Sequence, residues 1–119
     1  MKKAYDRQLA QQLLPLLESI GQEIAERLHE VRILQGRIAV QEYHGGEVTE
    51  LLDLKATLAN HKREVRLASK ELERLGCTLD DDCPGRILIP GADGEVAHGF
   101  TWEASDPSLR RVSTGTVVG

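Results

Sequence analysis

The fold is decided by residues 31–58, VRILQGRIAVQEYHGGEVTELLDLKATL, in which two apolar patterns flank one turn. On both sides of the turn, apolar residues recur at alternating spacings of three and four, the pattern of a helix that packs along another helix. His44 is followed by Gly45 and Gly46, and glycine adopts the left-handed dihedral angles that end a helix without strain. The stretch therefore predicts two helices joined by a tight turn.

The same spacing extends outward from this stretch in both directions. The apolar positions are Ala10, Leu13, Leu17, Ile20, Ile24, Val31, Leu34 and Ile38, then Leu51, Leu54, Leu58, Val65, Ala68, Leu72 and Leu75. In an antiparallel hairpin, the residue numbers of facing positions have a nearly constant total. Ile38 with Leu51 totals 89, and the other pairs total 88 or 89, which places the midpoint at the turn. We therefore predict a long, coiled-coil-like antiparallel hairpin with helices over 6–43 and 47–75.

Two polar residues interrupt this seam, and the same register places them opposite each other: Arg27 and His61. One interpretation is a buried polar site or a pH-sensitive latch. The other is a structural pair that fixes the register, with Arg27 reaching towards Glu23, Glu30 or Glu64. We favour the structural pair, because single polar seam residues commonly act in this way.

Pro15 lies inside the first helical pattern, where it removes a hydrogen bond to the carbonyl of Gln11. We therefore expect a kink or a break near Pro15. The apolar face at this end is also wider than the seam needs, since further leucines lie beside it. These are Leu9, Leu14, Leu16 and Leu28. We expect the C-terminal segment to cover them, with a second copy of the chain as the other candidate.

The helical spacing of apolar residues ends at Gly76, a glycine at the position that commonly ends a helix. Residues 86–113 suggest a small β hairpin or three-stranded unit, with strands over Arg86–Ile89, Val96–Trp102 and Leu109–Ser113. In the middle strand, one face would carry Val96, His98, Phe100 and Trp102. The predicted fold is mainly α: a helical hairpin with a small C-terminal antiparallel β unit at its open end (α+β), in a single domain over 1–119.

Composition excludes several classes of protein. The chain has 119 residues and a net charge of −4, and its lysines and arginines are interspersed with glutamates, so we expect no nucleic-acid binding. We expect no membrane association either, because no leader or long apolar run is visible. Two cysteines are too few for a disulfide framework and fit a reducing compartment. A soluble, cytoplasmic protein is the expectation.

Few residues suggest chemistry. Cys77 and Cys83 lack C-x-x-C spacing, so a zinc site that they would form with His98 is a weaker hypothesis than two ordinary thiols. Asp81, in an acidic turn, and Trp102 complete the candidates for a site where the β unit meets the helix ends. No catalytic motif or phosphate-binding loop is present, and we predict no cofactor, no metal and no catalytic residue.

The order of motifs is similar to that of an uncharacterised prokaryotic family, domain of unknown function 2203. The matching segments are Leu13-Leu14-Pro15-Leu16-Leu17, Leu75-Gly76-Cys77-Thr78-Leu79-Asp80, Gly85, Pro90 and Phe100-Thr101-Trp102-Glu103. The resemblance extends from Leu9 to about Pro107. It diverges in the tail, where the family carries a further aromatic residue and a histidine and this chain has Leu109-Arg110-Arg111-Val112. The resemblance implies an architecture and no activity.

Two functional hypotheses follow. The leading one is a non-enzymatic interaction or scaffold protein that self-associates through helix faces into a homodimer or a higher even oligomer. It is motivated by the long seams, the excess apolar positions and the lack of a catalytic constellation. The alternative is a small-molecule or metal-binding protein, or an enzyme, with its site where the β unit meets the helix ends.

Overall fold

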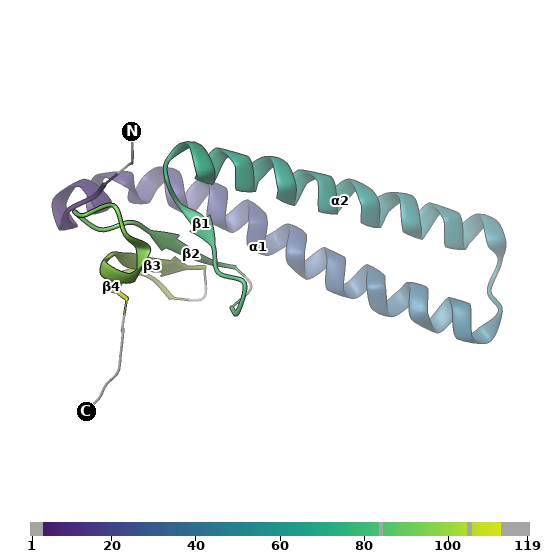
Figure 1. Ribbon diagram of the computed structural model, residues 1–119. Coiled ribbons are helices and arrows are strands. Elements are labelled where there is room, and N and C mark those ends of the chain that lie inside the picture. Colours follow the sequence, from purple (N-terminus) through teal and green to yellow (C-terminus); the bar gives the residue numbers. More distant parts are fainter. Residues whose placement is uncertain (1–3, 84, 105, 113–119) are drawn as a thin grey trace, which may run out of the picture.

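The computed structural model describes residues 4–83, 85–104 and 106–112. Two long helices lie side by side, and a four-stranded antiparallel sheet packs at their open end, which confirms the predicted α+β class (Figure 1). The elements in chain order are α1 (Arg7–His44), α2 (Val48–Arg74), β1 (Thr78–Leu79), β2 (Arg86–Ile89), the short 3-10 helix η1 (Val96–His98), β3 (Phe100–Glu103) and β4 (Asp106–Arg111). None of the described helices has a stretch apolar enough to cross a membrane.

Helix α1 begins where the carboxylate of Asp6 accepts a hydrogen bond from the Leu9 N–H at 2.8 Å, a standard N-cap. It ends at Gly45, whose φ of 66° is left-handed. The break considered at Pro15 is absent, because α1 runs through this residue as one helix. Pro15 and Gln11 are both exposed, so water can satisfy the carbonyl that the proline leaves without its helical partner.

The hairpin has the predicted register. The guanidinium of Arg27 lies 3.1 Å from the His61 ring, and Leu34 and Ile38 form one apolar cluster with Leu54. The turn between the helices is tight because the Gly45 and Gly46 N–H groups both bond to the carbonyl of Gln41, a carbonyl that the end of the helix would otherwise leave free.

Helix α2 ends in a Schellman motif. The Cys77 N–H donates to the Leu72 carbonyl and the Gly76 N–H to the Glu73 carbonyl, each at 2.9 Å. Gly76 has a φ of 79°, and Leu72 and Cys77 are buried in the same core, which is the apolar contact that accompanies this motif. The motif turns the chain sharply, so that β1 begins directly after it.

The strands follow one another in the order β1-β2-β3-β4, all antiparallel. The predicted two or three strands are thus an undercount. Strand β1 is only two residues long and carries no alternation that a sequence could reveal. Strand β4 begins at Asp106, earlier than the predicted Leu109, and Ser113, its predicted end, lies outside the described residues.

The strand predicted over Val96–Trp102 is wrong in its first half. Val96–His98 forms η1, in which the His98 N–H bonds to Glu95 and the Gly99 N–H bonds to Val96. The close backbone contact at Gly99 explains the change, because a Cβ there would lie 1.8 Å from the Ile89 carbonyl oxygen. Only from Phe100 onward does the chain pair with β2.

Alternate residues of the sheet form the core against the helices. Ile87, Ile89, Phe100 and Trp102 are buried on one face, as the pleat of a half-buried sheet requires. Of the four extra leucines, Leu14 and Leu28 pack against this core. Leu9 and Leu16 remain 47% and 46% exposed, so the prediction that the C-terminal segment covers them is wrong.

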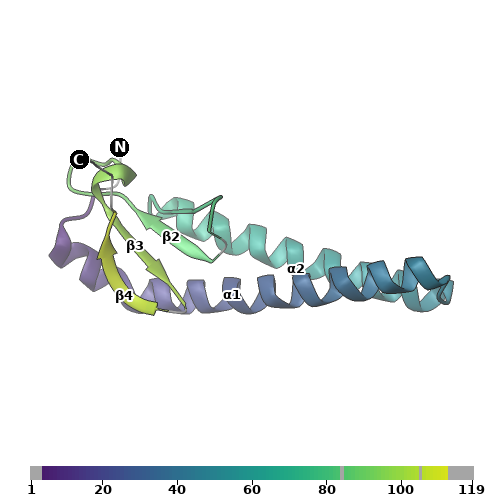
Figure 2. The same cartoon turned by 90° about the horizontal axis from the view of Figure 1, so that it is seen from below.

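Beyond this core the hairpin continues alone. Figure 2 shows the sheet beside the first half of α1 and the rest of the hairpin projecting past it. We call residues 29–60 the distal arm. The longest dimension of the molecule is 53 Å, close to the length of about 57 Å that a 38-residue helix has at 1.5 Å per residue. A small cluster, Leu34, Ile38 and Leu54, holds the arm together.

Candidate functional site

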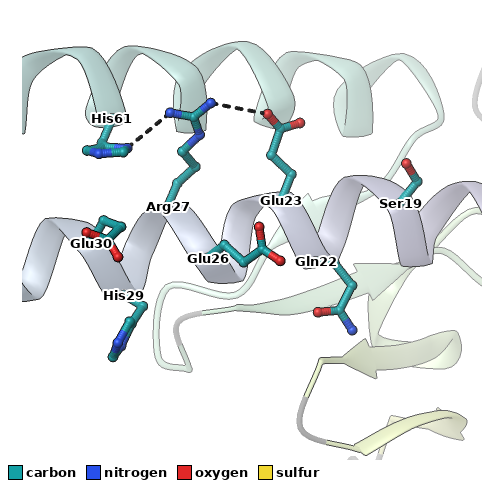
Figure 3. A pocket seen from close by; sticks show the side chains of 8 residues that line it. All are labelled: Ser19, Gln22, Glu23, Glu26, Arg27, His29, Glu30 and His61. Carbon is teal, nitrogen blue, oxygen red and sulfur yellow. Dashed lines mark hydrogen bonds and ion pairs between the residues drawn. The ribbon is translucent and has the colours of Figure 1, made fainter.

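The polar pair of the seam lies between the large core and the cluster of the distal arm. The Arg27 guanidinium is 3.1 Å from Nδ1 of His61 and 3.8 Å from a carboxylate oxygen of Glu23 (Figure 3). Because arginine can only donate, Nδ1 of His61 accepts in this contact. The Arg27 side chain is 29% exposed, so solvent reaches the pair.

A pocket of about 730 Å³ opens beside this pair. It is lined by Ser19, Gln22, Glu23, Glu26, Arg27, His29, Glu30 and His61. The lining contains three carboxylates and one guanidinium, which makes the wall acidic. Ser19, the hydroxyl of the lining, lies at the opposite end of the pocket from His61, and His29 points away from Arg27 (Figure 3). This lining therefore contains no nucleophile paired with a base.

The geometry of the pair supports the structural interpretation. Sliding the hairpin by one helical turn would place Arg27 against Leu58 or Val65 and leave its guanidinium without the His61 acceptor. An unpaired charge at a seam is costly, so the pair disfavours the neighbouring registers.

The residues considered for a metal site lie apart. Cys77 is fully buried, and burial raises the pKa of its thiol to about 12. Cys83 lies near Glu103, at the Arg86 end of the β2–β3 pair, whereas His98 lies beyond the Ile89 end. Within residues 4–83, 85–104 and 106–112, no three His, Cys, Asp or Glu side chains are grouped closely enough to hold a metal ion.

His98 and Asp93 form a separate pair on the surface. The pKa of the Asp93 carboxyl is lowered, first by a hydrogen bond from the Glu95 N–H and then by one with His98. Both side chains are exposed, and the pair links the loop after β2 to η1. Asp81 is exposed as well. His98 therefore stabilises a turn and does not share a face with Trp102.

Trp102 belongs to the core. Its side chain is fully buried, and its ring lies over Gly21 of α1 so closely that a Cβ at this glycine would be 2.1 Å from a ring carbon. The indole Nε1 is buried without a hydrogen-bond partner among the described residues. Trp102 is therefore a core residue, and α1 fills the space above its ring.

One further cluster ties the sheet together. Arg86 lies 3.7 Å from a carboxylate oxygen of Asp80 and 3.4 Å from one of Glu103. The Cys83 sulfur is 3.9 Å from the same Glu103 carboxylate. These contacts join Asp80 and the loop after β1 to β2 and β3.

Helix α1 carries a second, partly apolar stripe that was not predicted from the sequence. We call His29, Ile33, Gly36 and Val40 the outer α1 face. These residues recur at spacings of four, three and four, and all are exposed, with Ile33 at 42% and Val40 at 58%. A groove of about 510 Å³ runs along this face. The spacing was the available signal, although it is weaker than the seam because a glycine and a histidine interrupt it.

The fold and these surfaces define a class: a helical hairpin closed at one end by a small antiparallel sheet, with a free distal arm. The chain belongs to the family described as "Uncharacterized conserved protein (DUF2203)", whose model matches residues 3–111. This match confirms the resemblance drawn from the sequence. Searches of curated proteins and of solved structures each found no match.

Proposed function

We propose that this chain is a non-enzymatic interaction protein that self-associates through the outer surfaces of its helices. The observation that carries the proposal is the distribution of exposed large apolar side chains. Five of them lie on the distal arm: Ile33, Val40, Tyr43, Val48 and Leu52. They are between 42% and 85% exposed. Apolar residues gathered on one protruding element mark contact surfaces more often than scattered ones do.

The construction of the arm supports the same proposal. Its interior is one small apolar cluster, while the sheet and the large core lie at the other end of the hairpin. Helices draw most of their stability from tertiary packing, and a pair of this length has little of it along the arm. A second copy packed on the outer surface would supply the missing contacts.

The chemistry of the described residues favours this class over the alternative. The candidates for a ligand or metal site at the sheet end, Cys77, Cys83, His98 and Trp102, are buried in the core or separated along the strands. The free thiols Cys77 and Cys83 fit the cytoplasm, where we place the protein. We propose a homodimer as the basic unit.

Sedimentation velocity of the full chain, from low to high micromolar concentration, tests the proposal. We expect a species of twice the 13.2 kDa chain mass that dissociates on dilution. A mass of one chain at every concentration would overturn self-association.

A further inference from the structure

The two glycines of α1, Gly21 and Gly36, have opposite surroundings. Gly21 is needed because the Trp102 ring occupies the place of its side chain. Gly36 has no such reason, since a Cβ there would meet nothing within 4 Å. A glycine in the middle of a helix lowers helix stability, and no contact among the described residues compensates for it at Gly36. Because Gly36 has no side chain, the floor of the groove on the outer α1 face is open to a side chain from another molecule.

The groove around Gly36 has the shape and chemistry of a helix-binding surface. It is lined by Arg32, Ile33, Gly36, Arg37, Val40 and Gln41. Ile33 and Val40 rise on either side of the glycine, so a side chain from another helix can enter between them. Glu30 and Arg37, one turn before and after Ile33, are both exposed, and neither forms an ion pair within the described part of the chain.

The geometry points to a second copy of this chain as the occupant, with its α1 packed antiparallel on the outer α1 face; this inference rests on the proposed self-association. As in the hairpin itself, facing residue numbers should have a constant total. At a total of 67 to 69, Ile33 lies over Gly36 of the second copy, and His29 lies against Val40 of the second copy. Tyr43, which is 85% exposed, then covers Ala25 of the second copy.

The same register pairs opposite charges. Glu30 faces Arg37 of the second copy, and the two-fold symmetry of such a dimer repeats the pair. Arg32 and its symmetry mate lie on the other edge, offset by about 6 Å along the axis. The exposed apolar stripe, the open glycine and the charges of Glu30 and Arg37 are therefore matched by one register.

The antiparallel arrangement also keeps the two sheets apart. Each sheet lies beside the first half of its own α1 (Figure 2). With the helices overlapping over about residues 24–44, the two sheets lie at opposite ends of the pair, and the turn of one copy reaches residues 24–28 of the other, where the sheet-covered core ends. The overlap of about 30 Å follows from the rise per residue.

Charge reversal provides the test, in three full-length variants: Glu30→Arg, Arg37→Glu and the double variant. Each single variant turns both ion pairs into repulsions, so we expect its dimer to be at least about tenfold weaker. The double variant restores both pairs in swapped form and should dimerise again. Mixing the two single variants should give a one-to-one heterodimer, visible by native mass spectrometry when one variant is isotopically labelled. Glu71→Arg, an exposed reversal on α2, is the control and should dimerise as the unmodified chain does.

The outcomes separate the two proposals. If the single variants dimerise as tightly as the unmodified chain, the outer α1 face is not the interface, while self-association stands. If the single variants are monomeric and neither the double variant nor the mixture recovers, the antiparallel register is wrong. If the unmodified chain is itself monomeric, self-association fails and this inference fails with it. Circular dichroism of each variant establishes that it is folded.

Discussion

Single residues decide which surfaces of α1 pack against other elements and how closely those elements approach the helix. Gly21 and Gly36 are fifteen positions apart on the same helix, yet one lies under the Trp102 ring and the other faces open space. From the sequence pattern alone, both glycines are expected only to lower the stability of the helix. The difference depends on a strand that comes about eighty residues after Gly21 in the chain, and local pattern carries no information about that contact.

The two glycines predict opposite effects of one substitution. Gly21→Ala places a Cβ into the Trp102 ring and should lower the free energy of unfolding by roughly 1–3 kcal/mol, as overpacking does. Gly36→Ala meets no neighbour and should raise it by about 0.5–1 kcal/mol through helix propensity. Urea unfolding of dilute protein, followed by the fluorescence of the single tryptophan, measures both. Equal effects of the two substitutions would show that Trp102 does not pack on Gly21.

The two cysteines should differ in reactivity by a wide margin. Burial raises the pKa of the Cys77 thiol to about 12, so little of it is thiolate at pH 8, and burial also blocks access to it. Cys83 is only half-buried. A chromogenic disulfide reagent at pH 8 should therefore modify one thiol per chain quickly and the second only after urea is added. Fast modification of both thiols in the folded protein would contradict the burial of Cys77.

The same thiol makes stability depend on alkaline pH. Burial raises the pKa of Cys77 above its ordinary value of 9.0, so the folded state holds this proton more tightly than the unfolded state does. The contribution is complete below pH 9 and is lost as the pH rises towards 12. Burial also raises the pKa of Tyr5, whose hydroxyl donates to the Leu75 carbonyl at 2.8 Å, and this acts in the same direction. Unfolding curves at pH 8 and pH 10.5 should show the loss, and Cys77→Ala should reduce it.

At the scale of elements, the hairpin was predictable and most of the sheet was not. The seam extends over fifteen apolar positions, and the turn lies at its midpoint. The two features therefore predict the same register independently. The sheet offers no such redundancy. Strand β1 has only two residues, and the chain between Gly91 and Gly99 is shaped by close backbone contacts of Gly91 with His98 and of Gly99 with Ile89, which no sequence periodicity reveals.

The polar seam pair gives a prediction for the hairpin. His61→Leu removes the acceptor of the Arg27 guanidinium and should lower the free energy of unfolding by roughly 1–2 kcal/mol. Replacing both residues by leucine removes the unpaired charge, and this double variant should be at least as stable as the unmodified chain. Urea unfolding of both single variants and the double variant gives the coupling energy. A His61→Leu variant as stable as the double variant would show that leaving Arg27 without its acceptor costs nothing, which contradicts the prediction.

At the scale of the whole molecule, one end is held by a sheet-covered core and the other end is a distal arm whose apolar residues face outward. The sequence placed the candidate ligands Cys77, Cys83 and His98 within about twenty residues of each other, but the strands separate them in space. Sequence proximity could not reveal this, because the direction of each side chain depends on strand pairing. The apolar surface of the arm follows from periodicity alone, once the seam has been assigned to the partner helix.

The central claim is the antiparallel packing of α1 on α1, and disulfide trapping tests its register directly. In a Cys83→Ala background, a cysteine at Ile33 lies within about 3 Å, along the axis, of its symmetry mate, whereas one at Val40 lies about 18 Å from its own. A disulfide needs Cβ atoms about 4 Å apart. Under mild oxidation we predict a covalent dimer for Ile33→Cys and little for Val40→Cys, by non-reducing mass spectrometry. Equal trapping at both positions, or none at Ile33, would contradict this packing.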